Sequence, residues 1–214
     1  MSLPMEIEAK CYVCKSISKQ TILASTNTFG APDLDLRPAE MARSTMDWWI
    51  QECPFCGYVA ESIKEKTDIK AKFLKEESYR CCDNRGFKSG LAEQFYKYYL
   101  INIACKKFDA AFYAALHAAW ACDDSDDKEN AIYCRQKALM VIEKTHFNSK
   151  NEDIAVVRAD LLRRTGQFDL LINEYENKKF SKPILNDIIA FEIEKAKNKD
   201  DECYNVSDAV SDKD

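Results

Sequence analysis

Two Cys-x-x-Cys pairs constrain the fold of the first part of this chain more than any other feature. The pairs Cys11–Cys14 and Cys53–Cys56 each offer two thiols at a spacing that lets both sulfur atoms face one metal ion, and two such turns complete a tetrahedron. In the second turn, Pro54 stiffens the backbone and Gly57 tolerates a left-handed conformation after the second ligand. We therefore expect a small β zinc ribbon over residues 5–60.

Four thiolates favour one zinc ion with a structural role. Thiolates select zinc over harder cations, and four of them leave no coordination position for a reactive water. An iron–sulfur centre and a thioredoxin-like redox pair remain alternatives, although the strand–helix–strand pattern around a redox pair is missing. The 38 residues between the pairs exceed the usual spacing of about 15–20. The ribbon must therefore carry an insertion, which we place at residues 30–45.

The other cysteines are interpreted as structural thiols. Ten cysteines would be compatible with disulfides in a secreted protein, but residues 1–20 contain neither an apolar run nor a signal-like cleavage site. We therefore expect a cytoplasmic location, where such pairs indicate metal binding rather than disulfides. The adjacent pair Cys81 and Cys82 is poorly placed to chelate one ion together. Cys105, Cys122 and Cys134 fall on expected helices and are typical small core residues.

Composition and charge exclude several functional classes. The formal net charge of −5 makes a dedicated nucleic-acid or membrane-surface protein unlikely, and no run approaches the ~18 apolar residues of a membrane span. Five glycines form neither a P-loop nor a dinucleotide-binding motif. A Ser or Cys nucleophile with a histidine base would have to use His117 or His146. We expect His117 to be packed on the apolar face of its helix.

The rest of the chain is expected to be helical, so that the fold is mostly α. Residues 91–165 contain neither Gly nor Pro. Apolar residues recur at helical spacing over 92–103, 113–120, 131–142, 154–162 and 168–175, and a sixth helix is expected at 181–197. Ser89 and Asp109 are the expected caps of the first two. Residues 123–127 are expected to form a solvated turn.

A weak internal sequence similarity indicates repeated pairs of helices. Residues 105–110 resemble residues 165–170, and each segment joins one amphipathic helix to another that begins with Phe-Asp. The segment 161–169 is similar to the turn of a tetratricopeptide (TPR) repeat, although the two copies lie 60 residues apart rather than at the usual period of about 34. We expect a TPR-like array over 91–198, with a generic helical bundle as the alternative.

Two further segments complete the expected organisation. Residues 61–90 are too rich in aromatic residues and cysteine for a free linker, so we expect a connecting helical segment, helical at 67–75, that packs on both parts. Within the ribbon, short strands are expected near 21–25 and 48–51, and a short helix at 38–44. Residues 199–214 are expected to form a disordered acidic tail.

Four charged residues cluster in the insertion: Asp33, Asp35, Arg37 and Arg43. In an extended segment Asp33 and Asp35 face the same side, and such carboxylates suit acid–base chemistry or a second cation. Alternatively, they pair with the arginines, cap the following helix and order the loop. We expect an ordered loop with at least one Asp–Arg pair or helix cap, whose surface is the candidate ligand or partner site.

The N-terminal part resembles a family of bacterial proteins. The resemblance is carried by residues 24–38, 43–46 and 49–58. It covers residues 8–60 well and weakens over 90–175. It implies a zinc ribbon followed by TPR-like helices, without an assigned activity. Lys15 departs from the common ribbon pattern, because glycine often occupies this position after the second ligand of a turn.

The leading functional hypothesis is a non-enzymatic scaffold that binds a protein or peptide partner. Helical pairs form grooves for peptides, and the aromatic residues of 95–120 exceed what one core stripe needs. One alternative is nucleic-acid binding by the ribbon and the basic segment 61–90. Another is an enzyme that uses the loop with Asp33, Asp35 and Arg37. No membrane association is expected.

Overall fold

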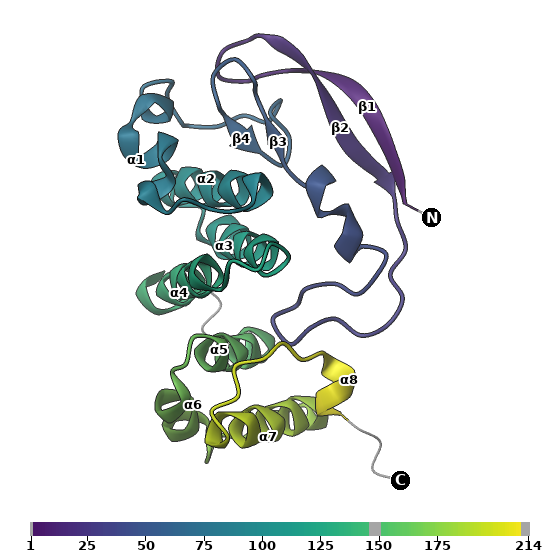
Figure 1. Ribbon diagram of the computed structural model, residues 1–214, viewed down its shortest axis with the longest axis vertical. Coiled ribbons are helices and arrows are strands. Elements are labelled where there is room, and N and C mark those ends of the chain that lie inside the picture. The colour runs from purple at the N-terminus through teal and green to yellow at the C-terminus, as the bar shows by residue number, and fades with distance from the viewer. Residues whose placement is uncertain (1, 146–150, 211–214) are drawn as a thin grey trace.

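The protein is a column of helices with two small hairpins at one end (Figure 1). The structure is a computed structural model that describes residues 2–145 and 151–210. It is mostly helical, as expected, and the cysteine pairs lie in the hairpin part. No helix in these two ranges is long and apolar enough to cross a membrane.

Each cysteine pair lies at the turn of an antiparallel hairpin. The first hairpin pairs β1 (Leu3–Lys10) with β2 (Ile17–Ser25), with Ile7 opposite Gln20. The second hairpin pairs β3 (Gln51–Glu52) with β4 (Val59–Ala60). The helix expected at 38–44 lies later, as a 3-10 helix over Arg43–Trp48. Pro38 therefore precedes the helix by several residues instead of starting it.

Six helices form the column, close to their predicted positions. They are α2 (Gly90–Ala104), α3 (Phe108–Asp123), α4 (Lys128–Thr145), α5 (Glu152–Arg164), α6 (Phe168–Tyr175) and α7 (Pro183–Lys197). Ser89 caps α2, where its side chain accepts a hydrogen bond from the amide of Ala92. Asp109 lies in the first turn of α3 instead of capping it. His146 lies outside the described residues.

The helices turn back on one another through a repeated C-terminal motif. After α2, Lys106 adopts a left-handed conformation and the Lys107 amide bonds to the Asn102 carbonyl at 2.9 Å. After α5, Gly166 is left-handed and the Gln167 amide bonds to the Leu162 carbonyl at 2.8 Å. Both are Schellman motifs, which satisfy the last carbonyls of a helix. The two segments that resemble each other in sequence therefore form the same turn.

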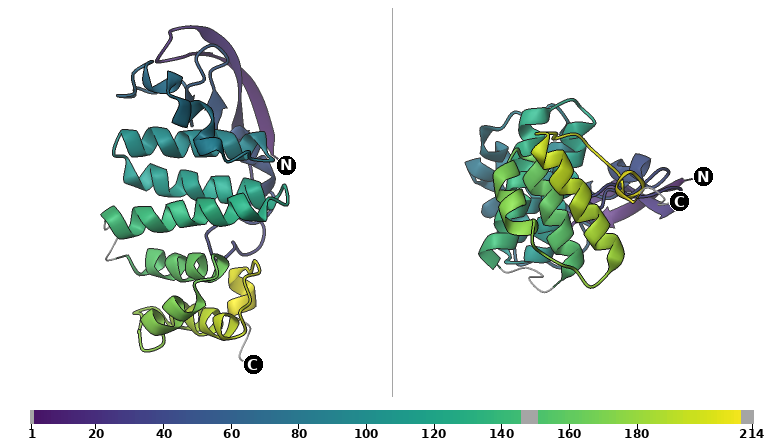
Figure 2. Two further views of the ribbon diagram at one scale, coloured as in Figure 1. Left: turned by 60° about the vertical axis from the view of Figure 1, so that its left-hand side comes forward. Right: turned by 90° about the horizontal axis from the view of Figure 1, so that it is seen from below.

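Helices α2 to α5 pack on one another as successive layers, and α6 and α7 lie together at the end of the column, both against α5 (Figure 2). The face of α3 is lined with alanines that are at most 1% exposed, which lets α2 and α4 approach closely. These alanines are Ala111, Ala114, Ala115, Ala118 and Ala119. Phe95, Tyr96, Phe112 and Trp120 are also buried in this core. Most of the aromatic surplus that suggested a binding groove therefore fills the interior.

Residues 61–90 lie between the hairpins and the column. The helix expected at 67–75 is replaced by a 3-10 turn at Phe73–Lys75 and by α1 (Glu77–Arg80). Within 67–75 only Leu74 is buried, so a longer helix would have no apolar face to pack. The buried Tyr79 donates a hydrogen bond to the carbonyl of Gly57 at 2.6 Å. Phe87 contacts the ring of Tyr96 on the other side.

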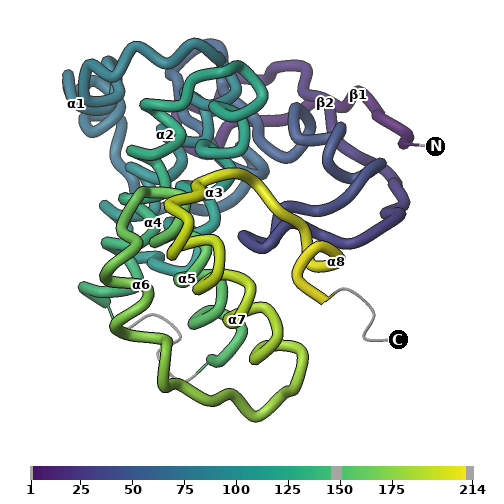
Figure 3. Tube along the Cα trace, turned by 60° about the horizontal axis from the view of Figure 1, so that its bottom comes forward, coloured from purple at the N-terminus to yellow at the C-terminus, as the bar shows by residue number. Residues whose placement is uncertain are grey.

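The segment after α7 differs from the expected disordered tail. Residues 199–205, which we call the return segment, run back across α5 to the insertion at residues 30–45 (Figure 3). The Leu34 amide donates to the Tyr204 carbonyl at 3.0 Å, and the Val206 amide donates to the Pro32 carbonyl at 2.9 Å. A short helix, α8 (Val206–Ala209), follows with a capping box. The segment is polar, but its backbone groups find partners on the insertion. Residues 211–214 lie outside the described residues.

Candidate functional site

The four predicted cysteines meet at one point between the hairpins. The sulfur atoms of Cys11, Cys14, Cys53 and Cys56 all lie within 4.8 Å of one another. The Cys11–Cys56 and Cys14–Cys53 sulfur distances are 3.7 and 3.6 Å. A tetrahedral zinc with Zn–S bonds of about 2.3 Å has S–S edges of about 3.8 Å. All four cysteines are free, and this donor set fits one tetrahedral metal ion.

The two cysteine turns have the same backbone hydrogen bonds. The Cys11 amide donates to the Ser16 carbonyl, and the Cys53 amide donates to the Tyr58 carbonyl, both at 2.9 Å. The fifth residue of each turn, Lys15 or Gly57, bonds back to the first cysteine with φ of 65° or 70°. Lys15 thus adopts the left-handed conformation that favours glycine. Its ammonium lies 4.1 Å from the centre of the Tyr12 ring, a contact that supports this conformation.

Burial and hydrogen bonds shift the pKa values of these thiols in opposite directions. Burial raises the pKa of Cys14, but hydrogen bonds from Ser16 and the neighbouring cysteines outweigh it and lower the pKa to about 6. Burial raises the pKa of Cys53 and of Cys56, partly offset by the backbone amides of Phe55, Cys56 and Tyr58. Ionised sulfurs at this spacing repel one another, and a bound cation would supply the counter-charge.

The predicted loop charges separate into two sets instead of sharing one site. Arg43 pairs with Asp33, with 2.5 Å between Nη2 and Oδ1, so the expected Asp–Arg pair forms within an ordered loop. The other oxygen of Asp33 accepts a hydrogen bond from the thiol of Cys203 at 3.4 Å. Neither Asp33 nor Asp35 caps the following helix, whose first turn has no side-chain cap.

Asp35 is instead buried against the helical column. It is 1% exposed, and its Oδ2 accepts a hydrogen bond from the Trp120 indole at 2.8 Å. The same oxygen lies 3.3 Å from Arg135 Nη2 and 3.9 Å from Arg164 Nη1. Asp35 therefore attaches the insertion to α3, α4 and α5.

Arg37 belongs to the same ion network, where its partner Asp124 lies at the surface. It pairs with Asp124 at 2.5 Å, whereas Arg135 bonds both oxygens of Asp123, at 3.1 and 2.5 Å. We define the ion network as three cations and three carboxylates that balance in charge: Asp35, Arg37, Asp123, Asp124, Arg135 and Arg164. Burial raises the pKa of Asp123, but Arg135 and the other arginines lower it overall, so the carboxylate is ionised.

Sequence analysis missed Arg135 and the role of the acidic turn. Arg135 lies among the buried residues of α4, next to Cys134, and an arginine on an apolar helix face is the signal that a buried carboxylate faces it. The turn expected to be solvated is partly buried. Asp127 is 5% exposed and accepts hydrogen bonds from the Lys88 amide and from Asn130.

A charged cleft of about 420 Å³ opens beside the ion network. Its walls are the insertion, the α3–α4 turn, the first turns of α4, the end of α5 and the return segment. Charged residues of both signs line it, among them Asp33, Arg37, Arg43, Asp123, Lys128, Arg135, Arg164, Asp201 and Glu202. Asp35 is not among the lining residues, because Trp120 and Arg135 cover it. Three of the four predicted loop residues thus face one cleft.

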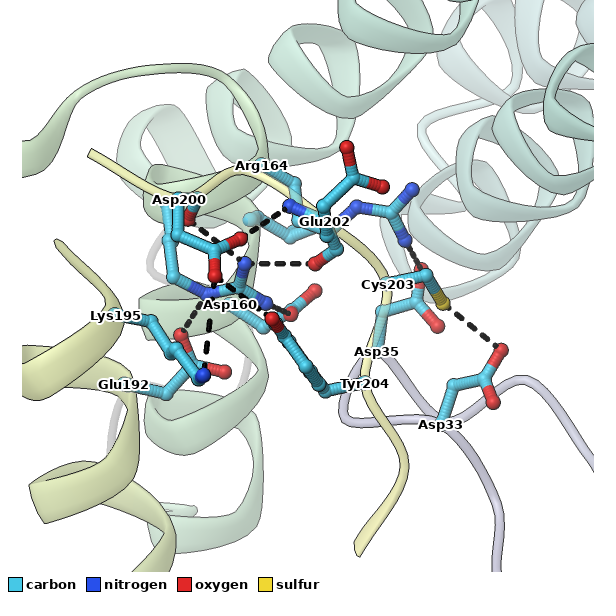
Figure 4. A network of polar contacts seen from close by, with 12 residues as sticks. Asp33, Asp35, Asp160, Arg164, Glu192, Lys195, Asp200, Glu202, Cys203 and Tyr204 are labelled. Carbon is cyan, nitrogen blue, oxygen red and sulfur yellow. Dashed lines mark hydrogen bonds and ion pairs between the residues drawn. The ribbon is translucent and has the colours of Figure 1, made fainter. Parts of the chain in front are cut away.

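A second buried arginine holds the return segment. Arg163 is 0% exposed and lies between two carboxylates, with Nε 2.6 Å from Glu192 and Nη2 2.8 Å from Asp160. Its Nη1 donates to the carbonyls of Asp200 and Glu202 at 3.1 and 2.7 Å. Figure 4 shows the return segment passing over this pair of carboxylates, with Cys203 directed at Asp33.

The two carboxylates beside Arg163 make the stability of the fold depend on pH. Burial raises the pKa of Glu192 to about 8, with the Asp160 charge acting in the same direction. Glu192 keeps its proton in the folded chain at pH values where the unfolded chain has lost it. The free energy of unfolding should therefore fall as pH rises from about 5 to 8, by up to about 1.4 kcal/mol per unit from this group.

Glu192→Gln should remove this pH dependence, because the amide imitates the protonated acid and keeps an acceptor for Arg163. Urea unfolding of both proteins at pH 5.5 and pH 8 checks it. The variant should gain stability relative to the wild type at the higher pH. Parallel stability curves for the two proteins would contradict the prediction.

The remaining sequence candidates are packed residues. The His117 ring lies among those of Trp49, Phe95 and Trp120, with centroids 5.2, 5.1 and 4.8 Å away. Burial lowers the pKa of His117 to about 4, so the ring is neutral at pH 7. Cys82, Cys122 and Cys134 are buried, Cys105 is half-buried, and Cys81 is exposed.

Comparisons with protein families, curated proteins and solved structures gave no match to the chain. The resemblance to a bacterial family therefore stays an interpretation of the sequence.

Proposed function

We propose that the protein is a non-enzymatic scaffold in which a zinc ribbon braces a TPR-like helical array that binds a protein partner. The observation that carries the proposal is the stacking of α2 to α5, each on its neighbours along the chain, with α6 and α7 packed together on α5. Such arrays present extended surfaces made from several helices. Here the insertion and three helices enclose the charged cleft beside Arg37, Arg43 and Arg164.

We also infer that Cys11, Cys14, Cys53 and Cys56 bind one zinc ion with a structural role. The support is the set of four sulfurs at tetrahedral spacing. Four thiolates complete the coordination shell, so the ion would hold the two hairpins together rather than activate water.

The alternatives receive less support from the arrangement of charges. An enzyme using Asp33, Asp35 and Arg37 needs reactive groups that converge, but Asp33 and Asp35 have different partners. A nucleic-acid site at 61–90 needs a basic surface, but the exposed lysines of this segment share it with exposed acidic residues such as Glu61, Glu65 and Asp68.

Site-specific photocrosslinking in cells tests the scaffold proposal. A photoreactive residue replaces Ile132, which lines the cleft, or Gln136, which is exposed one turn further along the same helix. We expect a discrete crosslinked partner from position 132 that is absent or weaker from position 136. Equal adducts from both positions, or none from either, would contradict a partner site at the cleft.

A further inference from the structure

We propose that the return segment occupies a peptide-binding site, and that the partner of this protein docks an extended acidic segment in its place. The inference rests on the proposed scaffold function and names the class of partner. The ligand it predicts has two adjacent acidic residues followed, three residues after the second, by an aromatic ring, as in Asp200, Asp201 and Tyr204 of the return segment.

The backbone of the return segment is held as an extended peptide ligand would be. Asp33 and Asn205 form an antiparallel β-bridge, with hydrogen bonds from the Leu34 amide and to the Pro32 carbonyl. The buried Arg163 adds two hydrogen bonds to the carbonyls of Asp200 and Glu202. These hydrogen bonds involve only the backbone of the return segment. Another extended segment whose side chains fit the site can therefore form them.

Side chains of the return segment supply the selectivity. Asp201 pairs with Lys128 of α4 at 2.9 Å, and Asp200 lies 3.8 Å from Lys195 of α7. The Tyr204 ring packs edge-on against Phe191 at 5.1 Å and lies 5.3 Å from the Arg163 guanidinium. The site therefore selects a ligand by two features. Two lysines pair with its acidic residues, and Phe191 and Arg163 contact its aromatic ring.

The residues of the return segment are more exposed to solvent than the residues on which the segment lies. None of residues 199–210 is buried, whereas Arg163, Asp160 and Glu192 beneath it are at most 1% exposed. Segments with few buried apolar groups open at a small fraction of the global unfolding free energy. The return segment can therefore leave while the column stays folded, and a competing peptide then meets a preformed site.

Peptide binding to the full-length protein tests the inference. The probe is a fluorescent peptide of residues 198–206 carrying Cys203→Ser, and the protein is either wild type or the triple variant Asp200→Lys, Asp201→Lys, Tyr204→Ala. We expect the variant to bind the peptide at least tenfold more tightly, because its own segment competes poorly. A peptide with the same three substitutions should not bind.

A matched variant controls for charge. Asp68→Lys with Asp169→Lys makes the same charge change at two exposed sites and should bind the peptide as the wild type does. Equal affinity of the wild type and the folded triple variant would overturn the inference. If position 132 still crosslinks a partner in that case, the scaffold proposal stands and only the peptide class is wrong.

Hydrogen exchange on the unmodified protein gives a second test that needs no variant. The amides of Leu34 and Val206, which bond the return segment to the insertion, should exchange at least 100-fold faster than the amide of the buried Leu116 in α3. Equal protection at all three amides would show that the segment opens only on global unfolding, and the inference would be wrong.

Discussion

Replacing Cys53 by serine is expected to abolish zinc binding by the purified protein and to unfold the two hairpins. Cys53 is fully buried, and its sulfur lies 3.6 Å from that of Cys14. Serine is a poor zinc ligand, so the variant keeps only three of the four sulfur ligands. Structural zinc ions contribute about 10 kcal/mol in small modules, which no other contact in this part can replace. The β1–β2 hairpin is mostly exposed and has little core of its own.

Elemental analysis and thermal unfolding measure this effect. We expect one zinc per chain in the wild type, almost none in Cys53→Ser, and a large fall in melting temperature. Cys81→Ser is the matched control, because Cys81 is exposed and far from this cluster in the sequence. It should keep both the metal and the melting temperature. A zinc-free wild-type protein, or a Cys53→Ser variant that melts as the wild type does, would contradict the assignment.

Replacing Arg135 by methionine is expected to destabilise the protein by about 3–5 kcal/mol. Arg135 is 1% exposed and bonds both Asp123 and Asp35. Methionine fills much of the volume but leaves the buried Asp35 without its nearest cation. Removing one partner of a buried ion pair costs more than the pair contributes, because the remaining charge stays desolvated.

Two further variants separate this mechanism from loss of any charged side chain. Lys182→Met removes a cation from an exposed pair with Asp153 and should change stability by less than about 1 kcal/mol. Arg135→Met combined with Asp35→Asn should cost less than the sum of the two single changes, because the uncompensated charge is gone. Additive effects in urea unfolding would show that Asp35 and Arg135 are not coupled.

The ion network joins parts of the chain that are far apart in sequence. Asp35 of the insertion and Arg135 of α4 are 100 residues apart. Outside the network, the hydrogen bond from Cys203 to Asp33 joins residues that are 170 apart. The insertion therefore acts as the connection between the two hairpins and the middle of the helical column. Arg135→Met should loosen the insertion together with the return segment that it holds.

The local features of this protein can be predicted from its amino-acid sequence. The spacing of the two cysteine pairs indicates the metal-ligand cluster, because a Cys-x-x-Cys turn sets two sulfurs by its own backbone geometry. Helix positions follow from apolar spacing and caps such as Ser89, since these are effects of residues three or four apart. The Asp33–Arg43 pair was likewise predictable, because both residues lie in one loop.

The partners of the loop charges, by contrast, depend on the tertiary structure. Asp35 and Asp33 are two residues apart, yet the first turns to Trp120 and Arg135 and the second to Arg43 and Cys203. The return segment is polar, and its composition alone predicts disorder. However, the segment runs from the end of α7 to the insertion, and its backbone forms a β-bridge with it. Such contacts depend on how the helices stack. The spacing of residues along the chain does not contain that information, because charges balance across packed surfaces rather than along the sequence.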